Sequence, residues 1–170
     1  QDIKEKMKIE KIIEDYGQSI YRISCCYTDS TEEQEDLVQE ILIAVWKSLK
    51  NFRGESSLKT YIYKVSKNHA ISYLIKKKKS FEYEELNEEG SVSIKNPESE
   101  LLSKENFESI IKKVKTLPLG LRQVFSLYLE GLDYNEISEA LSISKSSVGV
   151  RLHRAKKHLN SIRGESLCKN

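Results

Sequence analysis

The chain has 170 residues, of which seven are glycine and two are proline. Nine turn-forming residues in 170 are about 5%, against roughly 12% in average usage, which argues against sandwiches, barrels and Rossmann folds and favours helices. The formal net charge of +2 indicates nothing about a nucleic-acid partner by itself, so the distribution of charge along the chain matters more.

Charge changes sign in blocks. Residues 29–40 contain six acidic side chains and no lysine or arginine, whereas residues 47–79 carry a net charge of +9, from ten basic residues and one glutamate. Residues 81–105 have a net charge of −6, from eight glutamates and two lysines, and residues 144–163 have +6. The near-neutral total therefore conceals two basic surfaces separated by an acidic segment.

Two helices are expected at the start of the chain. Apolar residues recur at helical spacing between residues 9 and 23, which predicts the first. The second opens at Ser30 or Thr31, where Glu33 or Gln34 can complete a capping box, and its apolar residues between 37 and 49 form one wide face. The loop 51–57 breaks this period.

A third helix is expected from a serine cap at 56 or 57 to about Lys78. The side chains predicted to face inward are Leu58, Tyr61, Ile62 and Val65. Lys59, Tyr63 and Lys67 recur every four residues and form a separate stripe. Cations for phosphates and a ring for base stacking are what a single strand of nucleic acid needs. A solvated face with a tyrosine lying on lysine methylenes shows the same spacing, so the spacing leaves both interpretations open.

A linker is expected between two helical domains. Residues 81–100 are acidic, contain several Asn, Ser and Gly, and show no sustained apolar period. The predicted architecture is all-α, with domains at residues 1–80 and 101–165, a flexible acidic linker at 81–100 and a tail at 166–170.

The second domain has the pattern of a helix-turn-helix. Pro118 fits the first position of a helix that Gly131 ends with a left-handed cap. Asp133 and Glu136 form a capping box for a short helix, and after a brief turn Ser144 caps a final basic helix. A short acidic helix, a turn and a basic helix are typical of this motif, although a bundle can also expose a basic helix.

The final helix is expected to read duplex DNA. Its first turn would reach base edges in the major groove, and cations further along would meet phosphates. The residues predicted to contact the duplex are Ser144, Lys145, Ser146, Ser147, Arg151, Arg154 and Lys157.

No cofactor, metal or catalytic group is expected. Cys25, Cys26 and Cys168 lack disulfide or metal-ligand spacing and predict free thiols in a reducing compartment. The acidic residues at 32–40 could hold a metal, but carboxylates at a helix start ordinarily complement the helix dipole. The longest apolar run, residues 41–46, is too short to span a membrane, and no signal-peptide pattern is present. A non-enzymatic cytoplasmic protein without membrane insertion is therefore expected.

Three motifs together resemble the extracytoplasmic-function (ECF) sigma factors, the smallest members of the bacterial sigma-70 family. They are EDLVQEILIAVWKSL at residues 35–49, FRGESSLKTYIYKVSKNHAISYL at 52–74, and LPLGLRQVFSLYLEGLDYNEISEALSISKSSVGVRLHRAKKHL at 117–159. They occur in the family's order, with the acidic segment between the second and the third. One departure is Gly149, which stands where the family usually has a lysine and removes one phosphate contact.

The resemblance implies a sigma-2-like helical bundle, a sigma-4-like helix-turn-helix, and a role as a subunit of RNA polymerase. Such a subunit binds core polymerase, directs it to promoters and opens the DNA, while the polymerase performs the chemistry. The residues implied to contact polymerase are Asp36, Gln39 and Glu40. Those implied to read the separated strand of the −10 element are Arg53, Lys59, Tyr61, Tyr63, Lys64, Lys67 and Asn68. The helix at 144–157 would read the duplex −35 element.

The resemblance also implies an anti-sigma factor as a partner, beside core polymerase and promoter DNA. The alternative is a stand-alone helix-turn-helix repressor or activator. Such a protein would need a dimer to read two half-sites, and it would leave the first two motifs without a role.

Overall fold

The computed structural model describes the backbone of residues 2–85 and 102–167, and the side chains of residues 9–79 and 106–161. The described part of the chain is helical and contains no strand, so the all-α prediction is confirmed. Its helices are α1 (Asp2–Cys25), α2 (Thr31–Leu49), α3 (Leu58–Glu85), α4 (Leu102–Lys115), α5 (Leu119–Leu129), α6 (Tyr134–Leu141) and α7 (Lys145–Leu167).

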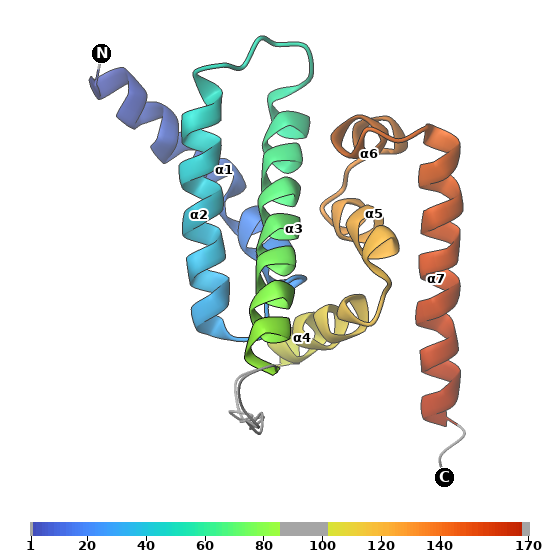
Figure 1. Cartoon of the computed structure of the whole chain (residues 1–170). Helices are drawn as coiled ribbons and strands as arrows, with labels where there is room; N and C mark the ends of the chain where they lie inside the picture. The colour runs from blue at the N-terminus through green and yellow to red at the C-terminus, as the bar shows by residue number, and fades with distance from the viewer. Residues whose placement is uncertain (1, 86–101, 168–170) are drawn as a thin grey trace.

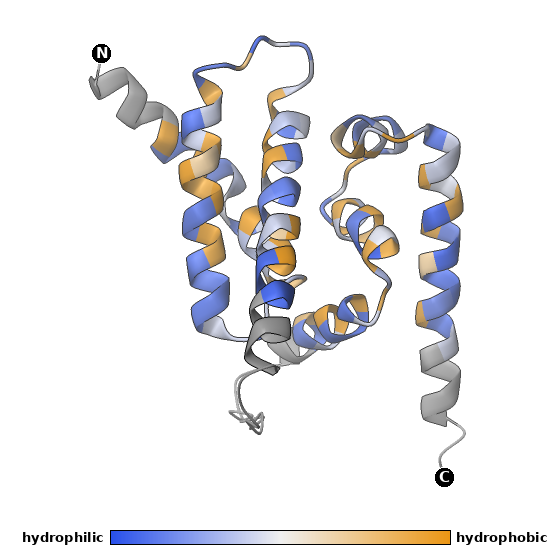
Figure 2. Cartoon of the chain, viewed as in Figure 1, coloured by the Kyte–Doolittle hydropathy of each residue, from blue (hydrophilic) through white to orange (hydrophobic). Residues whose placement is uncertain are grey.

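The helices form two lobes that pack against each other (Figure 1). In the first lobe, α1 crosses behind the antiparallel pair α2 and α3. In the second, α5 and α6 lie between α3 and α7, and α4 runs beneath them. Hydrophobic and hydrophilic positions alternate along the helices, as amphipathic helices around thin cores require (Figure 2).

The start of α2 follows from its sequence. Ser30 is the N-cap, and its Oγ accepts a hydrogen bond from the Glu33 amide at 3.2 Å. The Glu33 carboxylate accepts from the Asp29 amide, so the return bond of the expected capping box reaches one residue further back. Leu37, Ile41 and Val45 are completely buried at four-residue spacing, which confirms the predicted inward face of this helix.

Helix α3 departs from the sequence expectation at both ends. It runs to Glu85 instead of about Lys78, so residues 81–85, which were expected to begin the linker, continue the helix. The remainder of the expected linker lies outside the described residues. At the other end, Leu58 was expected to face inward but is 38% exposed, because it is the first residue of the helix beside an open loop.

The turns of the second lobe are those its sequence predicts. Gly131 has φ 77° after α5, in the left-handed region that glycine adopts without steric penalty. Asp133 and Glu136 form the capping box of α6. Ser144 caps α7, since its Oγ accepts from the Ser147 amide at 3.2 Å. Pro118 is the N-cap of α5 and not its first helical residue, a shift of one position. Helix α4 has no individual counterpart in the sequence expectations.

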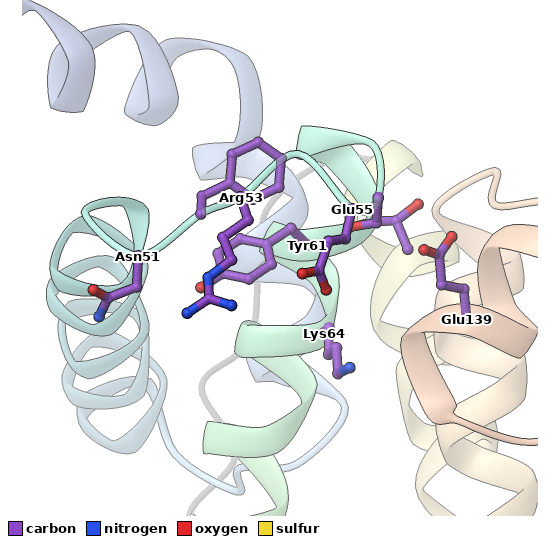
Figure 3. A pocket seen from close by; sticks show the side chains of 9 residues that line it. Asn51, Arg53, Glu55, Tyr61, Lys64 and Glu139 are labelled. Atoms are coloured by element: carbon purple, nitrogen blue, oxygen red, sulfur yellow. The ribbon is translucent and has the colours of Figure 1, made fainter.

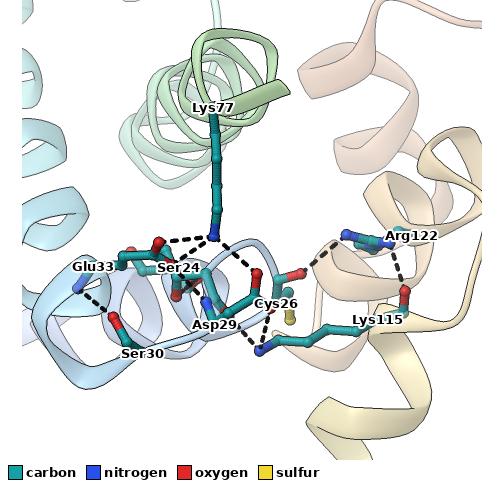
Figure 4. A network of polar contacts seen from close by, with 9 residues as sticks. Ser24, Cys26, Asp29, Ser30, Glu33, Lys77, Lys115 and Arg122 are labelled. Atoms are coloured by element: carbon teal, nitrogen blue, oxygen red, sulfur yellow. Dashed lines mark hydrogen bonds and ion pairs between the residues drawn. The ribbon is translucent and has the colours of Figure 1, made fainter. Parts of the chain in front are cut away.

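The turn that ends α1 joins the two lobes. Residues 23–28 are all buried, and the Tyr27 hydroxyl lies 3.4 Å from the Ser126 hydroxyl of α5. The Lys115 ammonium donates to the Thr28 carbonyl, and Arg122 donates to the Cys26 carbonyl at 3.5 Å (Figure 4). The second lobe is therefore attached to backbone groups of the first.

An ion-pair network fixes the far end of α3 to the same turn (Figure 4). The Lys77 Nζ lies 2.9 Å from the Asp29 carboxylate and 2.7 Å from that of Glu33, and Lys115 reaches Asp29 at 3.6 Å. The hydrogen bond from Lys77 lowers the pKa of Asp29. Burial by itself would raise the pKa of Glu33, but the bonds from Lys77 and from the Asp29 amide outweigh it, and the pKa is lowered.

Replacement of Lys77 by alanine should destabilise the protein in a pH-dependent way. Carboxylates with lowered pKa values stabilise the fold above their unfolded pKa of about 4, and this contribution disappears as the pH falls through the folded value. Lys77→Ala should therefore lower the free energy of unfolding by about 0.5–1 kcal/mol at pH 7 and by much less near pH 2.5, measured by urea denaturation. The exposed Lys78→Ala is the control, and an equal loss at both pH values would contradict the assignment.

Two glycine-to-alanine substitutions should have opposite effects. A Cβ at Gly149 would meet the Tyr134 ring at 3.6 Å, an ordinary contact, so Gly149→Ala should stabilise α7 by about 0.5–1 kcal/mol. Gly131→Ala should destabilise the second lobe by about 1 kcal/mol, because its φ of 77° is strained for any residue with a Cβ.

Thermal unfolding followed by circular dichroism measures both changes. A lower unfolding midpoint for Gly149→Ala than for the wild type would contradict the prediction that the higher helix propensity of alanine stabilises α7.

Candidate nucleic-acid interfaces

The loop between α2 and α3 borders a pocket at one end of the first lobe. Gly54 takes φ 73° in this loop, and Ser57 begins α3 by accepting a hydrogen bond from the Thr60 amide at 3.0 Å. The pocket has a volume of about 320 Å³ and is called the loop pocket below (Figure 3). Its lining residues are Asn51, Phe52, Arg53, Glu55, Ser56, Thr60, Tyr61, Lys64 and Glu139.

Aromatic rings and cations meet in the loop pocket. The Tyr61 ring lies 4.9 Å from the Phe52 ring at an angle of 48°, and its hydroxyl donates to the Ser48 carbonyl at 3.1 Å. Arg53 and Lys64 are exposed beside these rings. A fixed ring can stack on a base while neighbouring cations hold phosphates. The pocket thus combines the two groups that single-strand binding requires.

The stripe expected on α3 is not one accessible surface. Tyr63 is 4% exposed and packs edge-on against Tyr16 of α1, with the ring centroids 6.4 Å apart at 85°. Position 63 faces inward because α1 covers that side of α3, and the expectation of a solvent-facing tyrosine is wrong in this arrangement. Lys67 is half-buried, and burial followed by the neighbouring charge of Lys64 lowers its pKa. Asn68 is exposed.

Lys59 is already paired. Its ammonium lies 3.3 Å from the carboxylate of Glu136, at the start of α6 in the second lobe. Glu139 of the same helix lines the loop pocket from the other side (Figure 3). Sequence reasoning missed both glutamates as neighbours of this site, because no sequence pattern indicates which face of the second lobe approaches the first.

The outer face of α2 is acidic and open. Asp36, Gln39 and Glu40 are exposed on the side away from the buried positions. A hollow of about 530 Å³ adjoins this face, and Ile43, which is 52% exposed, lines it with Glu40. The sequence analysis did not single out Ile43. The sequence could have pointed to Ile43, because an isoleucine there lies outside the inward face of α2, at a position where a polar residue would be usual.

The final helix exposes part of its predicted contact set. Lys145, Ser146, Arg154 and Lys157 are exposed, whereas the buried side of α7 is formed by Val148, Leu152 and Ala155.

The other three members are an exposed serine and two half-buried residues, Ser147 and Arg151. The Ser144 and Ser147 hydroxyls lie 2.9 Å apart within the cap of α7. Arg151 is half-buried, with its guanidinium 3.7 Å from the position that a Cβ on Gly120 would occupy. The exposed cations and the first turn of α7 are therefore the accessible part of this surface.

The described residues contain neither a metal-binding cluster nor a membrane-spanning helix. No group of three or more His, Cys, Asp or Glu side chains is arranged there to hold a metal ion. No described helix is long and apolar enough to cross a membrane. Cys25 and Cys26 are buried free thiols, and burial, with a smaller effect of Cys25, raises the pKa of Cys26 to about 12.

Known sequences match both lobes. Residues 12–80 match the profile of Sigma-70 region 2, and residues 107–159 match that of Sigma-70, region 4. The chain is 30% identical over 136 residues to the ECF RNA polymerase sigma-E factor of Escherichia coli K12, an alignment that covers 74% of this chain and 71% of that protein. It is 29% identical over 142 residues to the sigma-E factor of Haemophilus influenzae, covering 78% and 75%.

Two solved structures share the fold. CnrH in complex with the cytosolic domain of CnrY matches with a TM-score of 0.70 and 14% identity, over 94% of this chain and 90% of that chain. The sigma factor RpoE in complex with the anti-sigma factor NepR from Bartonella quintana matches with a TM-score of 0.72 and 17% identity, over 92% and 97%. At these identities the likeness shows the common fold.

Proposed function

This chain belongs to the ECF group of sigma-70 family RNA polymerase sigma factors, and from that premise we propose how its surfaces divide the work of promoter recognition. It is a sigma factor that binds core polymerase and directs transcription initiation. The observation that carries the division is that one chain bears both a pocket of rings and cations and a helix-turn-helix with an exposed basic face.

The loop pocket is proposed to bind the separated strand of the −10 element. Extruding a base costs a few kcal/mol, and stacking on a ring such as Tyr61 returns about 1–3 kcal/mol per base. Arg53 and Lys64 supply charge for the flanking phosphates. Tyr63 contributes by holding α3 against α1, since its ring is buried there.

Helix α7 is proposed to read the duplex −35 element. Lys145 and Ser146 are at the N-terminal turn that enters the major groove in this motif, and Arg154 and Lys157 are placed for phosphates. Asp36, Gln39 and Glu40 are proposed to contact core polymerase, since they form an exposed face of α2 that no described helix covers.

The proposed domain boundaries, partners and cellular location follow from the same family membership. We place the single-strand reader in residues 1–80 and the duplex reader in 101–165, with an acidic connection between them. An anti-sigma factor is a proposed partner, supported by the solved complex of RpoE with NepR. We expect no catalytic activity, because the polymerase partner performs the chemistry. A cytoplasmic location is expected because that is where the chain would meet polymerase and promoter DNA.

In vitro transcription tests this function. The purified chain, added to core polymerase on a promoter library, should direct initiation from a defined subset of templates. Asp36→Lys/Glu40→Lys should abolish it by removing polymerase binding, while Glu14→Lys, an exposed charge change on α1, should not. Tight, sequence-specific duplex binding by the isolated chain, with no initiation on adding polymerase, would favour the stand-alone regulator instead.

Substitutions on α7 should fall into two classes. Arg154→Ala or Lys157→Ala should weaken binding of the holoenzyme to all promoters and reduce the slope of log affinity against log salt by about one. Lys145→Ala and Ser146→Ala should change the preferred −35 sequence. Binding to a library of −35 variants at several salt concentrations separates the classes, and identical behaviour of both would contradict the division.

A further inference from the structure

Three glutamates of the second lobe face the first lobe, and one of them, Glu139, lines the loop pocket. Glu130 follows α5, and Glu136 and Glu139 belong to α6; together they are called the acidic edge below. Opposite them lie Arg22, Lys59 and the cations of the loop pocket. Carboxylates and phosphates bind the same cationic side chains, so the acidic edge presents to the first lobe the type of charge that a DNA strand would present.

The position of Glu136 is fixed by its own helix. One carboxylate oxygen accepts from the Asp133 amide at 2.8 Å as part of the capping box of α6. The other lies 3.3 Å from the Lys59 ammonium. Because the capping box holds the side chain whether or not Lys59 is present, the carboxylate is pre-positioned for this contact.

Among the described residues, Glu130 makes the least exposed ion pair between the lobes. Arg22 donates to its two oxygens at 2.8 and 2.7 Å, and the Glu130 side chain is only 5% exposed. A bidentate pair of this kind fixes orientation as well as distance. It therefore fixes the C-terminal end of α5 against α1.

The surfaces proposed for the other partners remain open in the same arrangement. Asp36 and Glu40 on α2 are exposed, and so are Lys145, Arg154 and Lys157 on α7. Among the three proposed surfaces, the contact between the lobes thus engages only the single-strand surface, at Lys59 and at one wall of the loop pocket.

We propose that Glu136 and Glu139 of the acidic edge occupy part of the single-strand surface of the first lobe in the free chain, so that the second lobe and a DNA strand compete for Lys59 and for the loop pocket. This inference rests on the proposed function of the loop pocket. Binding the strand requires α6 to move away from Lys59 and the pocket. Because the polymerase and duplex surfaces are uncovered, the chain can engage both before the lobes separate.

Single-strand binding by the full chain tests the competition. The double variant Glu136→Gln/Glu139→Gln keeps the capping box, which accepts Gln at this position, but removes two charges from the edge. Its affinity for a fluorescein-labelled oligothymidylate at low salt, measured by anisotropy, should rise about three- to tenfold. The control Glu10→Gln/Glu14→Gln makes the same charge change on exposed positions of α1 and should alter affinity by about twofold or less. Equal increases in both variants would overturn the proposal.

A reversible lock provides a second test. Lys59→Cys/Glu136→Cys in a Cys168→Ser background can be joined by a short bis-methanethiosulfonate linker, which dithiothreitol removes. The buried Cys25 and Cys26 should stay unmodified, because burial raises the pKa of each thiol. The joined protein should bind the oligonucleotide at least about tenfold more weakly than the same protein after reduction. Equal affinity before and after reduction would overturn the proposal.

The proposed function and the proposed competition can be contradicted independently of each other. If the wild-type chain directs initiation with core polymerase but the joined and reduced forms bind the strand equally, the competition is wrong and the proposed function stands. If wild type never directs initiation, the proposed function fails, and anisotropy still reports whether the acidic edge and the strand compete.

Discussion

The buried turn between α1 and α2 is the constraint on which the arrangement of the lobes depends. Residues 23–28 are inaccessible, so their polar groups must find partners inside the protein. Ser24 and Thr28 donate to carbonyls of their own segment at 2.9 and 2.8 Å. The carbonyls of Cys26 and Thr28 accept from Arg122 and Lys115 of the second lobe. Polar contacts to backbone thus fix which face of the second lobe approaches the first.

The attachment of the second lobe at this turn brings acidic residues of that lobe next to the basic segment of the first. Once the second lobe is fixed at this turn, α6 contacts α3, and Glu136 meets Lys59 while Glu139 borders the loop pocket. The basic segment 47–79 is then neutralised in part by acids that lie far away in the chain. Helix α7, which carries the exposed cations Lys145, Arg154 and Lys157, lies on the side of the second lobe away from α3 (Figure 1).

Most of the local structure could be predicted because it depends on short-range chemistry. Ser30, Asp133 and Ser144 begin helices by accepting hydrogen bonds from amides three residues on, and Gly131 ends one in a left-handed conformation. The motifs that indicated a sigma factor lie on these helices, and the family membership is confirmed. The end of α3 was misplaced because the helix continues into charged residues that show no apolar period.

The sequence by itself determined the helices other than α4 and the end of α3, most of their caps, the helix-turn-helix and the family, since these depend on motifs of residues near one another in the chain. Only the tertiary structure decided that Tyr63 is buried, that Lys59 is paired and that Glu139 borders the loop pocket. Tyr63 has the helical spacing of an exposed stripe, but α1 covers it. Helical periodicity gives the angle of a side chain about its own axis, whereas burial and pairing depend on which other element lies at that angle.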